Sequence, residues 1–179
     1  RLRKRIALAS RYSCMEIGHM KVRADGELCG CGGHGCLETV ASRLSVSAAV
    51  AAAAYRGSAP TVLKEAGTDL GAIRSSLLAE SIAAGEKAVK DIVRRSARWI
   101  GLALANAVNL LGPDLVLLGG GLVEAMPELY LKEIREAVLE NTMETLSKDL
   151  AFAVAELGDN ATIMGAAALA EGAARAREK

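Results

Sequence analysis

The sequence reads Glu16-Ile17-Gly18-His19 and then, nine residues later, Cys29-Gly30-Cys31-Gly32-Gly33-His34-Gly35-Cys36-Leu37-Glu38. Three thiols and an imidazole within so short a stretch form the ligand set that tetrahedral zinc prefers. Four protein ligands close the coordination shell against water, which is typical of a structural rather than a catalytic zinc ion. The glycines between the cysteines let the chain turn tightly around an ion. We therefore predict a structural zinc site formed by His19, Cys29, Cys31 and Cys36.

The fourth ligand has alternatives at this stage. His34 lies inside the same loop and Cys14 lies just upstream of the motif, and either could replace His19. A further alternative is a loop of reduced thiols that holds no metal. His19 is the ligand that we expect, because it would tie the loop to the segment that precedes it.

Composition excludes several classes of function. The 22 basic and 21 acidic side chains leave a net charge of +1, so no global field attracts nucleic acid or an anionic membrane surface. The longest apolar runs fall far short of the ~20 residues that cross a bilayer. Crowded cysteines favour a metal site in a reducing compartment over a disulfide framework, and we expect a cytoplasmic protein. The basic, acid-poor opening could also be a transit peptide, a solvated terminus, or the result of a missing true beginning.

The remaining sequence predicts an α/β architecture. Alanine-rich stretches and apolar residues at helical spacing predict helices, and short apolar runs next to glycine predict strands. Alternation of the two suggests helices layered on a sheet, with residues 16–179 behaving as one unit. The expected helices are 38–55, 61–66, 69–84, 86–111, 127–145 and 160–175 with Asp159 or Asn160 as N-cap, and the expected strands are 17–24, 115–118 and 151–157.

The motif as a whole reads Glu-x-Gly-His, then nine residues, then Cys-x-Cys-Gly-x-x-Gly-Cys-x-Glu. It resembles the zinc motif of the ROK family (repressor, open reading frame, kinase). The resemblance continues through the apolar strand and glycine triplet at 115–122 and through 157–167, so it covers roughly residues 16–170. It implies an actin/hexokinase-like, ribonuclease H-like ATPase lobe with a zinc-binding loop. In that fold, a glycine triplet after a strand lies where open α/β sheets place ligands.

The resemblance also implies an activity, which is transfer of the ATP γ-phosphoryl group to a hydroxyl of a hexose or amino sugar, with Mg²⁺. Glu16, His19 and Glu38 would contact sugar hydroxyls, and Gly119, Gly120 and Gly121 would contact the nucleotide. Carboxylates accept hydrogen bonds from hydroxyls, which agrees with that placement. Read singly, the two glutamates could be surface charges and the glycines a plain turn. We expect glucose as the default sugar and a homodimer as the assembly.

The chain departs from the family pattern in what it lacks. It contains neither the Asp-x-Gly-Gly-Thr phosphate loop nor the Asn-Asp pair that supplies the catalytic aspartate, so we assign no catalytic residue to it. Residues 1–15 contain no glycine where the family has a glycine-rich segment, which suggests a change of reading frame there. We therefore expect an atypical segment at 1–15 and, at 16–179, the C-terminal lobe of a ROK sugar kinase without its N-terminal lobe.

Two other functions remain open. Sugar-responsive ROK repressors carry the same zinc motif and add a DNA-binding helix-turn-helix, which is not visible here. A zinc-stabilised interaction module without catalysis would also explain the cysteine loop. Sugar binding and its dependence on Glu38 would separate the three.

Overall fold

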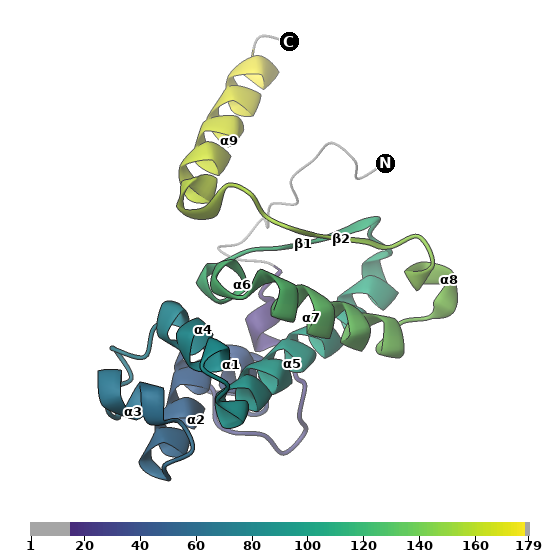
Figure 1. The fold of residues 1–179 in the computed structure, drawn as a ribbon. Helices are drawn as coiled ribbons and strands as arrows, with labels where there is room; N and C mark the ends of the chain where they lie inside the picture. Colours follow the sequence, from purple (N-terminus) through teal and green to yellow (C-terminus); the bar gives the residue numbers. More distant parts are fainter. Residues whose placement is uncertain (1–14, 178–179) are drawn as a thin grey trace.

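The computed structural model describes the backbone of residues 15–177 and the side chains of residues 15–172, and within that range the chain is mostly helical with one small sheet (Figure 1). This confirms the α/β class. The elements in chain order are η1 (Ile17–His19), α1 (Glu38–Ala41), α2 (Arg43–Tyr55), α3 (Pro60–Ala66), α4 (Ser75–Ala83), α5 (Lys87–Leu111), β1 (Leu115–Leu118), α6 (Gly121–Ala125), α7 (Pro127–Asn141), α8 (Glu144–Ser147), β2 (Ala151–Val154), η2 (Gly158–Asn160) and α9 (Ala161–Arg177).

The long helix α5 is the central element, as its apolar spacing predicts. Residues at intervals of three and four, among them Val89, Val93, Ala97 and Val108, are buried along one face. The helix ends at Gly112, which has left-handed backbone angles and donates its N–H to the Val108 carbonyl. Helices α1, α2 and α4 contact α5, α3 packs on α2 and α4, and α7 lies along another side of α5 (Figure 1).

Contact between α5 and α7 is the most extensive in the described structure. Gly101 allows the two backbones to approach closely, because a Cβ at this position would lie 2.8 Å from the Ile134 carbonyl oxygen and 2.5 Å from the Ala137 Cβ. Glu133, which is buried on α7, accepts a hydrogen bond of 2.6 Å from Arg94 Nε on α5. Small residues and a partly buried ion pair therefore fix the spacing of the helices.

The sheet has two parallel strands, with Leu115 opposite Ala151 and Leu118 opposite Val154. One face packs on α7, where Val116 and Leu118 join the main core. On the opposite face, Leu115 and Leu117 are 50% and 60% exposed. Parallel sheets are ordinarily covered on both faces, so this face is unusual.

Helices α2, α3 and α4 share the main core with α5 and α7, and a buried carboxylate links three of these helices. Glu86, at the N-cap of α5, is 9% exposed and accepts hydrogen bonds from the Thr61 backbone N–H, at 2.5 Å, and from the Ser81 hydroxyl. These bonds link the start of α3, the end of α4 and the start of α5.

Several predicted elements differ in the structure. The expected strand at 17–24 is wrong: it contains the short helix η1 and only isolated bridges, Lys21 with Cys36 being one of them. The expected helix at 38–55 is divided at Ser42, whose extended backbone and side-chain oxygen cap α2 through the Ser45 N–H. The predicted helix at 127–145 breaks after Asn141, and the one at 69–84 begins only at Ser75.

The C-terminal helix α9 projects away from the other helices (Figure 1), and all of residues 161–172 are exposed. The predicted helix at 160–175 is present, but it begins after η2, at Ala161. Among the described residues, no helix is both long and apolar enough to cross a membrane.

Candidate metal centre

The four predicted ligands come from η1 and the loop that follows it. His19 is the last residue of η1, Cys29 and Cys31 lie at a tight turn, and Cys36 lies two residues before α1. The turn is closed by hydrogen bonds from the Cys29 N–H to the Gly33 carbonyl and from the Gly32 N–H to the Cys29 carbonyl. Two bridges, Lys21 with Cys36 and Leu28 with His34, fold the loop back on itself. Local backbone structure thus brings ligands separated by up to seventeen positions together.

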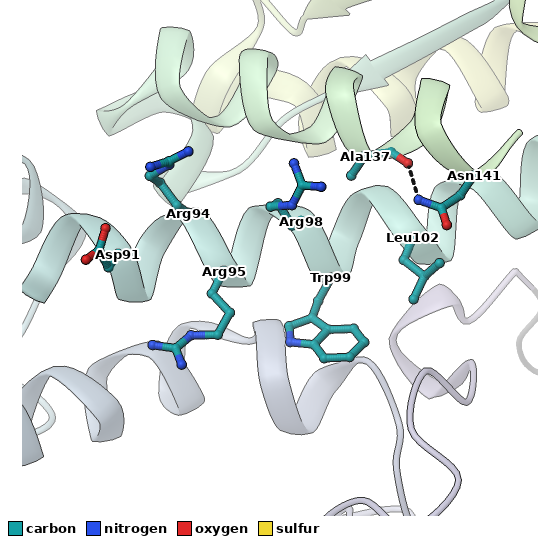
Figure 2. A pocket seen from close by; sticks show the side chains of 8 residues that line it. All are labelled: Asp91, Arg94, Arg95, Arg98, Trp99, Leu102, Ala137 and Asn141. Atoms are coloured by element: carbon teal, nitrogen blue, oxygen red, sulfur yellow. Dashed lines mark hydrogen bonds between the residues drawn. The ribbon is translucent and has the colours of Figure 1, made fainter.

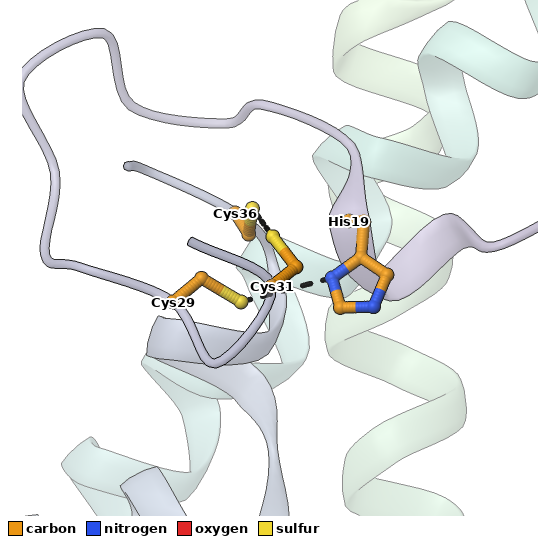
Figure 3. Close-up of side chains that lie close together, drawn as sticks. All are labelled: His19, Cys29, Cys31 and Cys36. Carbon is orange, nitrogen blue, oxygen red and sulfur yellow. Dashed lines mark hydrogen bonds between the residues drawn. The ribbon is translucent and has the colours of Figure 1, made fainter. Parts of the chain in front are cut away.

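The four ligand atoms all lie within 4.8 Å of one another (Figure 3). His19 Nδ1 lies 3.7 Å from Cys29 Sγ, and the Sγ atoms of Cys31 and Cys36 are also 3.7 Å apart. Zn–S bonds of about 2.3 Å in a tetrahedral arrangement would place two sulfurs roughly 3.8 Å apart. The donor set and its spacing therefore fit a zinc ion, and the other ring nitrogen of His19 faces away from the sulfurs (Figure 3).

His34 does not belong to this cluster. Its Nδ1 lies 3.2 Å from the Gly26 carbonyl oxygen, to which it donates, and its side chain is exposed. Cys14, the other alternative ligand, lies outside the described residues. Among the described residues, His19 is the imidazole that meets the three sulfurs.

Backbone packing holds the loop in shape. Gly35 has a φ of +72°, and a Cβ there would lie 1.7 Å from the Arg23 carbonyl oxygen. The Val22 and Arg23 N–H groups both donate to the Gly35 carbonyl. Only glycine fits this position, because a side chain would push apart the two arms of the loop that carry His19 and Cys36.

Lys21 is a residue of the candidate metal centre that the sequence did not point out. Its Nζ donates to Cys36 Sγ at 3.2 Å, so a positive charge lies next to the sulfur cluster. Gly33 leaves room for it, because a Cβ at Gly33 would lie 2.5 Å from that Nζ. Three thiolates with one divalent ion carry a net negative charge, which a neighbouring ammonium offsets. A lysine just before a cysteine loop was the available signal, but which sulfur it meets depends on the fold.

The cysteines differ in their readiness to ionise. The backbone N–H of Gly33, together with the thiols of Cys29 and Cys36, lowers the pKa of Cys31 to about 7. The Cys31 backbone N–H acts to lower the pKa of Cys29 as well, but burial and the neighbouring thiols outweigh it and the pKa is raised. Thiolate is the form that binds metal, so the exposed Cys31 is better prepared to bind than Cys29.

A small apolar cluster attaches the loop to the middle of α5. Leu37 and Ala41 pack against Ala103, with Trp99 and Ile17 at the edge. The metal centre is thereby joined to the central helix through the start of α1.

The predicted sugar contacts lie beside the cluster. Glu38 Oε1 is 3.9 Å from Cys29 Sγ, and the Glu38 carboxylate also faces Gly18, whose Cβ would lie 3.8 Å from Oε2. Glu38 lines a hollow of ≈ 410 Å³ with the rim of the loop and with residues of α2. Glu16 is the exposed N-cap residue of η1, two positions before Gly18. The structure thus places Glu38 and His19 at the cluster and Glu16 on the segment that adjoins it.

The glycine triplet forms a separate hollow. Gly119, Gly120 and Gly121 join the end of β1 to α6 and line a space of ≈ 240 Å³ together with Arg43 and Tyr130. Arg43 is the first residue of α2 and was not expected at this site. Arg43 directly follows the break at Ser42 that divides the predicted helix, and no local sequence pattern indicates its position at the glycines.

Comparisons with known proteins agree with the fold and the cluster. A glucokinase of Streptomyces coelicolor is 33% identical over 161 residues, which cover 87% of this chain and 50% of that protein. A putative xylose repressor of Caldicellulosiruptor sp. (strain Rt8B.4) is 29% identical over 157 residues, covering 86% of this chain and 38% of the repressor. The crystal structure of a ROK family glucokinase from Streptomyces griseus, in complex with glucose and AMPPNP, superposes with a TM-score of 0.73 at 32% identity, covering 86% and 50% of the two chains.

This chain spans half or less of the length of each of these relatives. The model of the ROK family matches residues 13–173. That match covers nearly the whole sequence, including the His19, Cys29, Cys31 and Cys36 cluster, and the chain belongs to the ROK family.

Proposed function

We propose that this chain is the zinc-stabilised, sugar-binding part of an ATP-dependent hexose kinase. The observation that carries the proposal is the position of the Glu38 carboxylate, 3.9 Å from Cys29 Sγ and exposed to solvent at the edge of a hollow. A carboxylate fixed beside a metal-held loop can accept hydrogen bonds from vicinal sugar hydroxyls. Such a site rejects analogues that lack the hydroxyl, because the carboxylate then loses its partner.

His19 would act with Glu38. A zinc ion at the cluster would supply rigidity and no reaction chemistry, because all four positions of a tetrahedral shell are filled by protein ligands. Nδ1 of His19 faces the sulfurs, so Nε2 is available to a substrate hydroxyl. With Nδ1 engaged, the ring keeps one tautomer and one angle, and Nε2–H becomes a donor of fixed direction.

For the nucleotide, we propose the hollow at Gly119, Gly120 and Gly121. The absence of side chains lets a ribose or an adenine approach the backbone closely, at the carboxyl end of β1. The Streptomyces griseus relative, described as bound to glucose and AMPPNP, supports a pair of sites of this kind.

The phosphate loops and the catalytic aspartate would come from a further part of the whole protein. The open face of the sheet, with Leu115 and Leu117 exposed, is a suitable contact for that part, since a parallel sheet is stable when both faces are covered. Residues 16–179 would then form the C-terminal lobe, and the chain by itself would not phosphorylate sugar. We further propose that the whole protein forms a homodimer.

Calorimetric titration with glucose, N-acetylglucosamine and N-acetylmannosamine tests the sugar site. We expect heat of binding for at least one sugar with the native chain and loss of about tenfold in affinity for Glu38→Ala, as for removal of a charge-assisted hydrogen bond. Glu80→Ala, a change at an exposed position of α4, is the matched control and should bind normally. Absence of binding for every sugar would instead favour a zinc-stabilised interaction module.

A second candidate is a sugar-sensing repressor, favoured by the xylose repressor among the relatives. The two functions share the sugar site and differ in what the whole protein does with it. A coupled assay of ATP-dependent sugar phosphorylation on the full gene product, run beside a DNA-binding assay, separates them. Phosphorylation identifies the kinase, and sugar-dependent DNA binding without phosphorylation identifies the repressor.

A further inference from the structure

A second group of polar side chains lies on the side of α5 that faces the metal-binding loop. Arg23 of the loop and Arg95 of α5 line one hollow of ≈ 280 Å³ together with Trp99. Hydroxyl-bearing residues Thr39, Ser45 and Ser96 complete its polar part, and none of its lining residues is acidic. It shares Thr39 and Ser45 with the hollow at Glu38, and it shares no lining residue with the hollow at the glycine triplet.

The arginines of α5 differ in the side chains that they contact. Arg94 and Arg98 point toward α7 (Figure 2), where Arg94 binds Glu133 and Arg98 Nη2 lies 2.5 Å from Glu140 Oε2. The Glu133 carboxylate raises the pKa of Arg94, in keeping with a tight pair. These two guanidinium groups serve the contact between the helices.

Arg95 points to the other side, with Trp99 one turn further along (Figure 2). Within the part of the chain that the structure describes, neither Arg95 nor Arg23 takes part in an ion pair. Arg95 and Trp99 also line a neighbouring hollow of ≈ 470 Å³, whose acidic lining residue, Asp91, lies near the paired Arg94. Two uncompensated guanidinium groups from different elements therefore face one space beside an indole.

We propose that this hollow binds a small molecule that carries an oxyanion group, either a phosphate or a carboxylate, on a flat apolar body. Guanidinium groups bind both oxyanions through paired, charge-assisted hydrogen bonds. The indole of Trp99 supplies a flat apolar surface for the rest of the molecule. The adjoining hollow of ≈ 470 Å³ is in the range of small-molecule sites, and the hollow of ≈ 280 Å³ is slightly below it.

The site would be coupled to the metal-binding loop. Arg23 belongs to the loop and its backbone is hydrogen-bonded to Gly35, while Trp99 packs against the Leu37 cluster at the start of α1. A ligand held by Arg23 and Arg95 would bridge the loop and α5. This inference does not depend on the proposed kinase activity.

Trp99 gives a direct readout because it is the single tryptophan of the chain. Its fluorescence is followed during titration with phenyl phosphate, benzoate and phenol, at low and moderate salt. We expect saturable changes with one or both anions, weaker binding at higher salt, and no comparable binding of phenol. The relative affinities of the two anions tell which oxyanion the site prefers.

Variants distinguish a specific anion-binding site from non-specific attraction of anions by positive charge. Arg23→Gln and Arg95→Gln should each weaken anion binding by about tenfold, as expected for loss of a charge-assisted contact. Arg56→Gln removes an exposed charge at the end of α2, away from the hollow, and should leave the affinity unchanged. The inference is overturned if neither anion binds saturably, if phenol binds equally well, or if all three variants weaken binding to the same extent.

Discussion

At the scale of single residues, Gly35 is the position on which the metal-binding loop depends most directly. A Cβ there would lie 1.7 Å from the Arg23 carbonyl oxygen, and the backbone has a positive φ. We predict that Gly35→Ala destabilises the chain by at least about 2 kcal/mol, through backbone strain and displacement of one arm of the loop. Thermal unfolding and elemental analysis for zinc measure the two effects.

Gly30→Ala is the matched control for that change. Gly30 lies in the same loop between two cysteines, but a Cβ there would meet no atom within 4 Å. We expect near-native stability and zinc content for this variant. An equal loss of stability and zinc content in both variants would show that the loop tolerates neither substitution, and would contradict the specific role given to Gly35.

Glu86 makes stability depend on pH. Burial acts to raise its pKa, but hydrogen bonds from Ser81 and from Thr61 outweigh it, and the pKa is lowered. A carboxyl whose pKa is lower in the folded state stabilises the fold above its unfolded pKa of about 4.3 and loses that contribution as the pH falls through the folded value. We predict that Glu86→Gln costs about 1–3 kcal/mol at neutral pH.

The measurement is urea unfolding at a series of pH values. The difference in stability between native protein and Glu86→Gln should be constant near neutrality and shrink below about pH 4, where the native carboxyl is protonated as well. A difference that stayed constant down to pH 2 would mean that the charge of Glu86 is not what stabilises this corner.

At the scale of elements, the packing of α5 on α7 depends on Gly101. We predict that Gly101→Ala lowers the free energy of unfolding by about 1–3 kcal/mol, because the new methyl group would overlap the Ala137 Cβ and the Ile134 carbonyl. Gly165→Ala on α9 is the comparison: its Cβ would meet nothing, and alanine favours a helix over glycine. The free energy of unfolding, measured in urea, should fall in Gly101→Ala and should rise or stay unchanged in Gly165→Ala.

Elements with strong local signals could be predicted from sequence. The spacing of Val89, Val93, Ala97 and Val108 defined α5, and the run at 115–118 beside glycines defined β1. The boundary at Ser42 was missed because the surrounding alanines favour a continuous helix, whereas the Ser42 side chain caps a new one. Residues 17–24 look like a strand, but within the described residues no neighbouring strand pairs with them, and they form a short helix and one isolated bridge instead.

The residues of the candidate site likewise fall into two groups, those that the sequence predicts and those that only the three-dimensional fold brings together. His19 was preferred to His34 because it would tie the loop to the preceding segment and because the motif resembles that of the ROK family, and the cluster geometry agrees with this choice. The contacts of Lys21 and Arg43 depend on how the loop and α2 fold in three dimensions, and no local pattern encodes them.

At the scale of the whole molecule, the uncovered face of the sheet governs association. Leu115 and Leu117 on β1, with Ile163 and Met164 on α9, leave large apolar side chains in water. We predict that the chain self-associates as its concentration rises and that Leu117→Lys reduces this association. Sedimentation velocity at several concentrations measures it, with Leu110→Lys, another exposed leucine on the far end of α5, as control. Unchanged association in Leu117→Lys would place the contact elsewhere.

All four ligand atoms of the metal centre belong to residues 19–36, so closing the loop around an ion requires little loss of chain entropy. During synthesis on the ribosome these residues emerge well before α5, the helix on which the corner finally rests. A newly made chain can therefore capture its metal before its core exists. If a zinc ion binds here, its supply during translation would affect how much of this corner folds.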